Sequence, residues 1–193
     1  MPSTQPLKTF SLEELQKRHS TKWRDFAPDI LPLPVMEMDF EIAEPIRRQL
    51  SELIQTSDTG YLGSIPEMAI NLASFAKARW NWELDTEGVF AATDVGVGVV
   101  EMARMVVSPG DHIVVDTPVY HNFANWINEL KCHIVDAPMK RDSLHYTLNI
   151  PLIEEAYKNG AKIHFLCNPQ NPTGTVHTRE ELSAIADLSL IHI

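Results

Sequence analysis

The strongest constraint on the fold is an alternation of short apolar runs and amphipathic segments that begins near residue 88. The apolar runs predict strands at 89–92, 112–116, 132–135 and 162–167. The segments that follow them predict helices at 96–107, 120–130, 151–158 and 178–188. Strands that alternate with helices form βαβ units, in which the strands are parallel. The sequence therefore predicts an α/β/α sandwich around a mainly parallel sheet.

The first 80 residues show a different pattern, in which helix signals are separated by proline-rich chain. Ser11 and Glu14 have the spacing of a capping box, which predicts a short helix running toward His19. Residues 20–43 contain several prolines and are expected to be irregular. Helices are predicted from Pro45 and from Pro66, because proline is tolerated in the first turn. The helix from Pro45 should carry one apolar face, made of Ile46, Leu50, Leu53 and Ile54. A turn is predicted at 60–63.

Composition excludes several classes of protein. The formal net charge is −10, which argues against a nucleic-acid partner. The two cysteines, Cys132 and Cys167, are expected to be small buried hydrophobes in strands, and this usage fits a reduced cytoplasm. The amino terminus lacks a basic region followed by an apolar one, and no apolar run is long enough to cross a membrane. The eight histidines have no metal-binding spacing, so no metal site is predicted.

Ligands of open parallel sheets bind at the carboxyl ends of the strands, which directs attention to loops 93–96, 117–120 and 168–174. In the first loop, Gly96 and Gly98 lie at the start of a predicted helix, whose free N–H groups could bind an anion. The dinucleotide-binding pattern GxGxxG is incomplete there, because Glu101 stands where its third glycine would be. A tight turn without a ligand is the alternative interpretation.

The other two loops carry an aromatic ring and a pair of amides. Tyr120 could stack on a flat ligand ring or could simply cover a helix end. The stretch from Asn168 to Gly174 reads Asn-Pro-Gln-Asn-Pro-Thr-Gly, and its prolines hold Asn168 and Asn171 in extended or turn conformations. A rigid amide at a strand end suits a hydrogen bond to a polar ligand atom.

This stretch resembles the NPxNPTG signature of the fold-type I pyridoxal-phosphate enzymes, the aspartate aminotransferase superfamily. Three further stretches resemble the opening of its cystathionine β-lyase or cysteine C–S lyase (MalY/PatB-like) branch. They are Lys-Trp-Arg at 22–24, Asp-Ile-Leu-Pro-Leu-Pro at 29–34 and Glu-Met-Asp-Phe at 37–40. The resemblance covers about residues 11–187.

The resemblance implies a cofactor, pyridoxal 5'-phosphate, and roles for particular residues. Its phosphate would bind at Val95 and Gly96, although Asp94 stands where the family has proline. Tyr120 would stack on the pyridine ring, and Asn171 would hydrogen-bond the phenolic oxygen of that ring. A second set of residues lies outside these loops. Tyr61 would reach the phosphate of a neighbouring subunit, which implies a homodimer, and Asp39 and Phe40 would lie on the substrate side.

The activity implied is β-elimination from cystathionine or another cysteine S-conjugate, which yields a thiol, pyruvate and ammonia. Two alternatives remain open at this point. One is a class I/II aminotransferase with the same cofactor site, and the other is a non-catalytic protein that regulates by binding a partner. A nucleotide-dependent dehydrogenase is disfavoured by the failed glycine fingerprint.

The resemblance also implies an incomplete chain. Residues 1–43 would be an arm and part of the small domain, and residues 44–187 a truncated cofactor-binding large domain. The cofactor-binding lysine would lie beyond Ile193, and no residue of this chain is nominated for catalysis. The strand at 89–92 would lack its partners, the strand at 162–167 would be an open edge, and the chain alone would be inactive. Residues 188–193 match a translated transposon-end adapter, which predicts a non-native tail.

Overall fold

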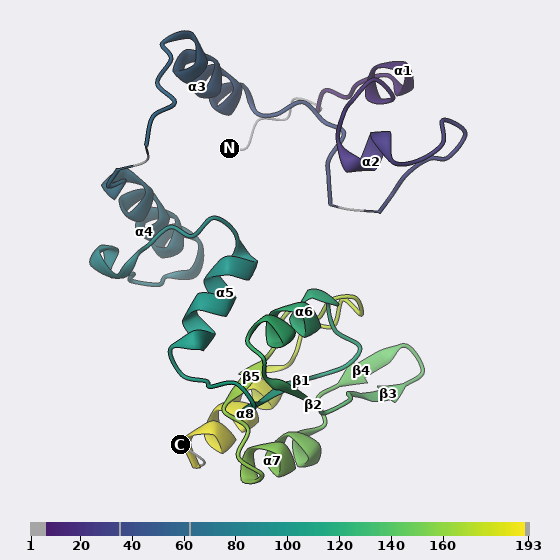
Figure 1. Cartoon of the computed structure of the whole chain (residues 1–193), viewed down its shortest axis with the longest axis vertical. Helices are drawn as coiled ribbons and strands as arrows, with labels where there is room; N and C mark the ends of the chain where they lie inside the picture. Colours follow the sequence, from purple (N-terminus) through teal and green to yellow (C-terminus); the bar gives the residue numbers. More distant parts are fainter. Residues whose placement is uncertain (1–6, 35, 62, 192–193) are drawn as a thin grey trace. The chain divides into compact units, whose positions relative to one another are not determined.

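The computed structural model describes residues 7–34, 36–61 and 63–191 and divides the chain into two compact units, Met1–Met68 and Ala69–Ile193 (Figure 1). Each unit is described separately. This division falls inside a helix that starts at Pro66, whereas the sequence suggested a boundary near residue 43. The assignment of 1–43 and 44–187 to two domains of the family stays a prediction.

The described part of the first unit includes α1 (Leu12–Leu15), α2 (Thr21–Arg24), α3 (Glu44–Gln55) and the first turn of the helix that starts at Pro66. The capping box of α1 is confirmed, since Ser11 and Glu14 bond reciprocally, but the helix ends at Leu15, short of His19. Helix α2 lies in the segment expected to be irregular. Helix α3 begins with proline in its first turn, as predicted, yet none of its residues is buried. The turn predicted at 60–63 includes Leu62, which lies outside the described residues.

The second unit is built around a three-stranded parallel sheet, which confirms the predicted fold class. The strands are β1 (His112–Val115), β2 (His133–Asp136) and β5 (Ile163–Phe165), in the order β2-β1-β5. In register, Val114 lies opposite Val135 on one side and His164 on the other. Strand β5 is an edge strand among the described residues, as expected.

Four helices flank this sheet, and each lies within a few residues of its predicted position (Figure 1). They are α5 (Val95–Arg104), α6 (Asn122–Glu129), α7 (Ile150–Lys158) and α8 (Arg179–Ile191). Successive residues of a strand face opposite sides of a sheet. Accordingly, Ile113 and Val115 pack in one apolar cluster with α5 and α6, and Val114 packs in a second cluster with α7 and α8.

The remaining elements of the second unit correct the predictions. The strand expected at 89–92 is absent, and the described residues there follow a single 3-10 turn, η1 (Thr86–Gly88). A strand needs a hydrogen-bonding neighbour, and residues 89–92 have none in the described part of the chain. An antiparallel hairpin of β3 (Lys140–Asp142) and β4 (His145–Thr147) was not predicted. Helix α4 (Pro66–Trp80) starts at Pro66, as predicted, and its Ala76 is buried.

Several surface and terminal features complete the description. Cys132 is buried as expected, whereas Cys167 is only half-buried, and both thiols are free. Each cysteine lies one or two residues outside its strand.

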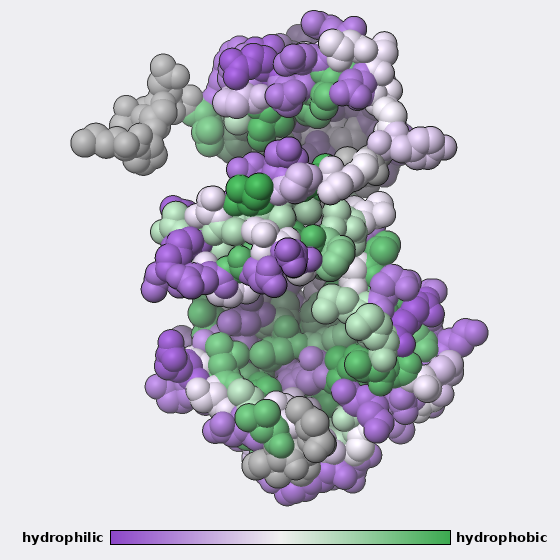
Figure 2. Space-filling model, turned by 90° about the vertical axis from the view of Figure 1, so that its left-hand side faces the viewer, coloured by the Kyte–Doolittle hydropathy of each residue, from purple (hydrophilic) through white to green (hydrophobic). Residues whose placement is uncertain are grey.

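Hydrophobic side chains reach the surface in the view of Figure 2. No helix in the described residues has the length and apolar character needed to span a membrane. Helix α8 continues to Ile191, residues 192–193 lie outside the described part, and the non-native origin of 188–193 stays a prediction.

Candidate functional site

The start of α5 offers two free backbone donors. Asp94 caps this helix: its side-chain oxygen accepts from the Val97 N–H at 2.9 Å, and its carbonyl accepts from the Gly98 N–H at 3.1 Å. The N–H groups of Val95 and Gly96 have no acceptor among the described residues. Because the first N–H groups of a helix have no partner inside it and carry partial positive charge, this end can bind an anion.

Gly96 also brings α5 against α6. A Cβ atom added at Gly96 would lie 2.7 Å from Nε1 of Trp126, so no larger residue fits without a shift of the indole. A groove of about 380 Å³ runs between the two helices and is lined by Asp94, Gly96 and Trp126, among others. The Trp126 ring lies 6.2 Å from the Tyr120 ring, centroid to centroid. Trp126 therefore lies beside Gly96 of the first loop and Tyr120 of the second loop.

Tyr120 lies between β1 and α6 and is half-buried. Its hydroxyl accepts a hydrogen bond of 2.6 Å from the Asn122 side-chain amide, and its ring meets the His121 ring at 4.7 Å. These contacts hold the ring near the carboxyl end of β1. Part of the ring remains accessible to a ligand.

Loop 168–174 is tied to loop 117–120 by a residue that the sequence analysis did not single out. Gln170 is 1% exposed, and its Nε2 donates to the carbonyl oxygens of Asp116 at 2.9 Å and Pro118 at 2.8 Å. The only sequence signal for this role is its position between two Asn-Pro steps. The buried amide bridges the segments that follow β1 and β5.

The two asparagines of this loop have different environments. The Asn168 side-chain oxygen accepts from the His177 N–H at 3.1 Å, which closes the loop. The Asn171 side chain is exposed and makes no hydrogen bond with the described residues, although its N–H donates to the Cys167 Sγ atom at 3.4 Å. Gly174 has a φ of 72°, which glycine adopts without strain. The Asn168 side chain thus stabilises the loop, whereas the Asn171 side-chain amide has no partner among the described residues.

The predicted substrate-side residue Asp39 lies in the first unit, where it joins two of the sequence motifs. Its carboxylate accepts from Lys22 Nζ at 2.7 Å and from Trp23 Nε1 at 2.8 Å, and Arg18 lies 3.9 Å away. Burial acts to raise the pKa of Asp39, but the hydrogen bonds and the charge of Lys22 outweigh it, so the pKa lies below its usual value. Phe40 pairs with Thr9 in an isolated antiparallel bridge.

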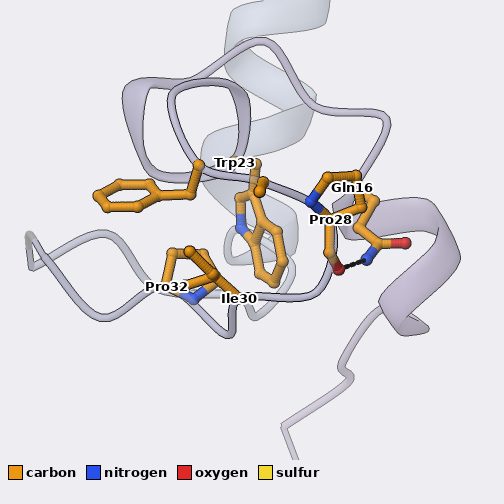
Figure 3. Close-up of a pocket in the computed structure, with 7 residues that line it drawn as sticks. Gln16, Trp23, Pro28, Ile30 and Pro32 are labelled. Atoms are coloured by element: carbon orange, nitrogen blue, oxygen red, sulfur yellow. Dashed lines mark hydrogen bonds between the residues drawn. The ribbon is translucent and has the colours of Figure 1, made fainter.

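The first unit also contains a small pocket beside Trp23 (Figure 3). It measures about 150 Å³ and is lined mainly by apolar side chains, including Ile30 and Pro32. The Gln16 amide borders it and donates to the Pro28 carbonyl at 2.9 Å. The described residues that line this pocket carry no charge. Tyr61, the remaining predicted site residue, is fully exposed in the same unit.

Comparisons with known proteins agree with this architecture. The family model for class I and II aminotransferases matches residues 28–192. A Mycobacterium leprae protein, named as a candidate cystathionine beta-lyase, is 36% identical over 97% of this chain and 48% of its own length. A pyridoxal-phosphate-bound structure from Clostridium difficile, described as a candidate aminotransferase, has a TM-score of 0.84 at 26% identity and covers 90% of this chain and 46% of its own.

A third match supports the fold alone, because its identity is lower. The pyridoxal-phosphate-containing structure of cystalysin from Treponema denticola has a TM-score of 0.84 at 24% identity, with 96% of this chain and 48% of its own covered. The chain spans about half the length of the curated relatives it matches. Since the family model covers most of the sequence, this chain belongs to the class I and II aminotransferase family of fold-type I pyridoxal-phosphate-dependent enzymes.

Proposed function

We propose that this chain is the amino-terminal half of a pyridoxal-phosphate-dependent carbon–sulfur β-lyase. The full protein would cleave cystathionine or a related cysteine S-conjugate to a thiol, pyruvate and ammonia. The main support for the cofactor site is the linkage of three loops at the carboxyl edge of the sheet, through Gln170 and Trp126. Relatives named as cystathionine beta-lyases favour the lyase branch.

The residues present fit the cofactor. Val95 and Gly96 supply two unpartnered N–H groups for the phosphate, and the missing side chain of Gly96 lets this helix start pack against Trp126. The Val97 N–H already donates to the Asp94 side chain. The N–H groups left for the phosphate at this helix start are therefore those of Val95 and Gly96. Tyr120 offers a ring face, and Asn171 offers a free amide for the ring oxygen. The bound cofactor would act as an electron sink for the negative charge that develops on the substrate Cα atom.

We nominate neither Lys158 nor Lys162 as the lysine that binds the cofactor. Lys158 forms an ion pair with Glu154 on α7 at 2.6 Å. Lys162 precedes β5, at the end of the strand opposite the loops, and its N–H donates to the His112 carbonyl. We therefore place the cofactor-binding lysine in the further sequence that the relatives possess, and we expect the 193-residue chain alone to be inactive.

Further parts of the proposal concern assembly and substrate. Tyr61 would reach the phosphate of a second copy, so the active protein would be a homodimer with shared sites. Asp39 and Phe40 would lie on the substrate side, with the Asp39 carboxylate held by Lys22 and Trp23. The small-molecule substrate and the free cysteines fit a cytoplasmic enzyme. Sedimentation of the full-length protein would test the dimer, and a monomer with full activity would contradict it.

Enzyme assays on the full-length protein separate the candidate activities. A lyase releases pyruvate from cystathionine without any keto acid. A class I/II aminotransferase, the activity suggested by the Clostridium difficile structure, consumes a keto acid as amino acceptor and releases no pyruvate from cystathionine. A complete reading frame without a cofactor-binding lysine would instead favour a non-catalytic, partner-binding regulator. Keto-acid-dependent transfer without pyruvate release would contradict the lyase proposal.

A further inference from the structure

A buried chain of polar side chains lies behind the loops of the sheet edge. Asp116 follows β1 directly and is 1% exposed. Its Oδ2 lies 2.7 Å from Nε2 of His164 on β5, and Nδ1 of His164 lies 2.7 Å from the hydroxyl of Tyr157 on α7. Three elements of the second unit are therefore joined by consecutive hydrogen bonds. None of these three residues is assigned to the cofactor above.

The chemistry of the three groups orders their hydrogen bonds. A carboxylate oxygen accepts hydrogen bonds, so the 2.7 Å contact is a bond donated by an Nε2–H group of His164 to Asp116 Oδ2. The Nδ1 atom then accepts from the Tyr157 hydroxyl. Burial, with a smaller contribution from the charge of Asp116, raises the pKa of Tyr157 to about 12, so this hydroxyl keeps its proton. The geometry thus places a proton on His164 Nε2, between this nitrogen and the Asp116 carboxylate.

Asp116 connects this chain to the loops through its backbone. The Asp116 side chain is bonded to His164, and the Asp116 backbone carbonyl accepts a hydrogen bond from Gln170 Nε2. The same Nε2 group also donates to the Pro118 carbonyl. Pro118 lies two residues before Tyr120, and Gln170 directly precedes Asn171. Moving either loop would break hydrogen bonds of a buried amide, and an unpaired buried amide is strongly disfavoured.

We propose that Tyr157, His164, Asp116 and Gln170 are positioning residues that set the spacing between Tyr120 and Asn171. The inference rests on the proposed cofactor site, because only there does this spacing matter for function. The four residues need not touch the cofactor. They act by fixing where the ring and the free amide lie.

The first test is Gln170→Met, a change of similar size that removes both donors, in the full-length protein. Without cofactor, amide hydrogen exchange in 117–120 and 168–174 should become roughly tenfold faster, while β1 and β2 stay unchanged, because two buried hydrogen bonds are lost. The dissociation constant for pyridoxal phosphate should rise by about the same factor. Gln49→Met, at an exposed position of α3, is the matched control and should change neither quantity.

A second variant acts from the far end of the chain. Tyr157→Phe removes one hydroxyl that lies on α7, away from both loops, and should increase exchange in 117–120 by roughly two- to fivefold, the effect of one hydrogen bond. Nitrogen-15 NMR of the unaltered protein should show His164 protonated on Nε2. If Gln170→Met does not fold, the exchange rates of Tyr157→Phe and the NMR of His164 test the positioning role in its place. An Nδ1–H tautomer, or unchanged exchange in Tyr157→Phe, would then overturn the inference.

The outcomes distinguish this inference from the proposed function. If Asn171→Ala weakens pyridoxal phosphate binding but Gln170→Met leaves both binding and exchange unchanged, the cofactor site stands and the positioning role is wrong. If Asn171→Ala and Tyr120→Ala leave cofactor binding unchanged, the proposed site itself is wrong. Faster loop exchange together with weaker binding in Gln170→Met supports both.

Discussion

The sheet unit and the amino-terminal unit are stabilised in different ways. In the sheet unit, Ile113, Ile127 and Ile153 are fully buried in apolar clusters on the two faces of β1. In the amino-terminal unit, the large hydrophobic residues Leu33 and Met36 are 82% and 99% exposed. This unit also contains a polar cluster, in which the Asp39 carboxylate accepts hydrogen bonds from Lys22 and Trp23.

Helices α3 and α7 show what this difference teaches. Both carry a proline in the first turn and an apolar stripe, yet α7 buries Ile153 and Ala156 and α3 buries nothing. An amphipathic sequence therefore predicts a helix and its apolar face, but packing energy arises only where the fold supplies a partner surface. The sheet supplies that surface for α7.

The largest expected effect is on the buried core. Ile153→Ala should lower the free energy of unfolding by about 2–5 kcal/mol, because it leaves a cavity at a fully buried site. Ile46→Ala, on the exposed face of α3, should change it by less than about 0.5 kcal/mol. Urea denaturation followed by circular dichroism measures both. Equal losses in the two variants would show that α3 is as well packed as α7.

The polar cluster of the first unit should give the next largest effect. Lys22→Met leaves the Asp39 carboxylate without its buried cation and should cost about 1–3 kcal/mol, a range reduced because Asp39 is partly exposed. Lys17→Met removes an exposed ion pair with Glu13 and should cost about 0–0.5 kcal/mol. Urea denaturation followed by circular dichroism measures the difference. A neutral Lys22→Met would mean that the cluster does not stabilise this unit.

Two equivalent capping boxes sharpen the comparison further. Thr178 caps α8, which places Ile185 in the core, whereas Ser11 caps only the four-residue α1. Replacing an N-cap by alanine costs about 0.5–2 kcal/mol, so Thr178→Ala should fall near the top of this range and Ser11→Ala near the bottom. Thermal denaturation of the two variants measures the order. The reverse order would show that α1 matters more to folding than α8.

The smallest expected effect is a loss of folding stability at acid pH, which we expect in both units. Burial acts to raise the pKa values of Asp39 and Glu181, but hydrogen bonds to each carboxylate outweigh burial and lower both. The stabilisation is therefore complete above the ordinary values of 3.8 and 4.5 and is lost as pH falls below them toward the lowered pKa values. Denaturation midpoints between neutral and acid pH should fall less steeply in Asp39→Asn and Glu181→Gln. Unchanged slopes would contradict the shifts.

How much the sequence could predict depends on the range of the interactions involved. The Ser11–Glu14 capping box, the proline-initiated helices and the parallel sheet were predicted correctly, because they depend on local contacts or on a repeated βαβ pattern. The strand at 89–92 was wrong: its partners were expected to be missing, and an apolar run without a neighbouring strand does not form a strand. The three-residue strands of the β3–β4 hairpin were missed because they are too short to show alternation.

The candidate site divides in the same way. Gly96, Tyr120 and Asn171 were nominated from loops at strand ends, and these nominations stay predictions. Gln170 was missed because its role depends on the carbonyl groups of Asp116 and Pro118, which are distant in sequence. The bond between Lys22 and Asp39 was likewise not predicted, although both residues belong to motifs that had been singled out.

The most direct test of the account is a crystal structure of the full-length protein with pyridoxal phosphate. The account predicts the phosphate on the Val95 and Gly96 N–H groups, the Tyr120 ring against the pyridine ring, and the Asn171 amide on the ring oxygen. A cofactor bound elsewhere, or a site in which Gly96, Tyr120 and Asn171 do not all contact the same molecule, would contradict it.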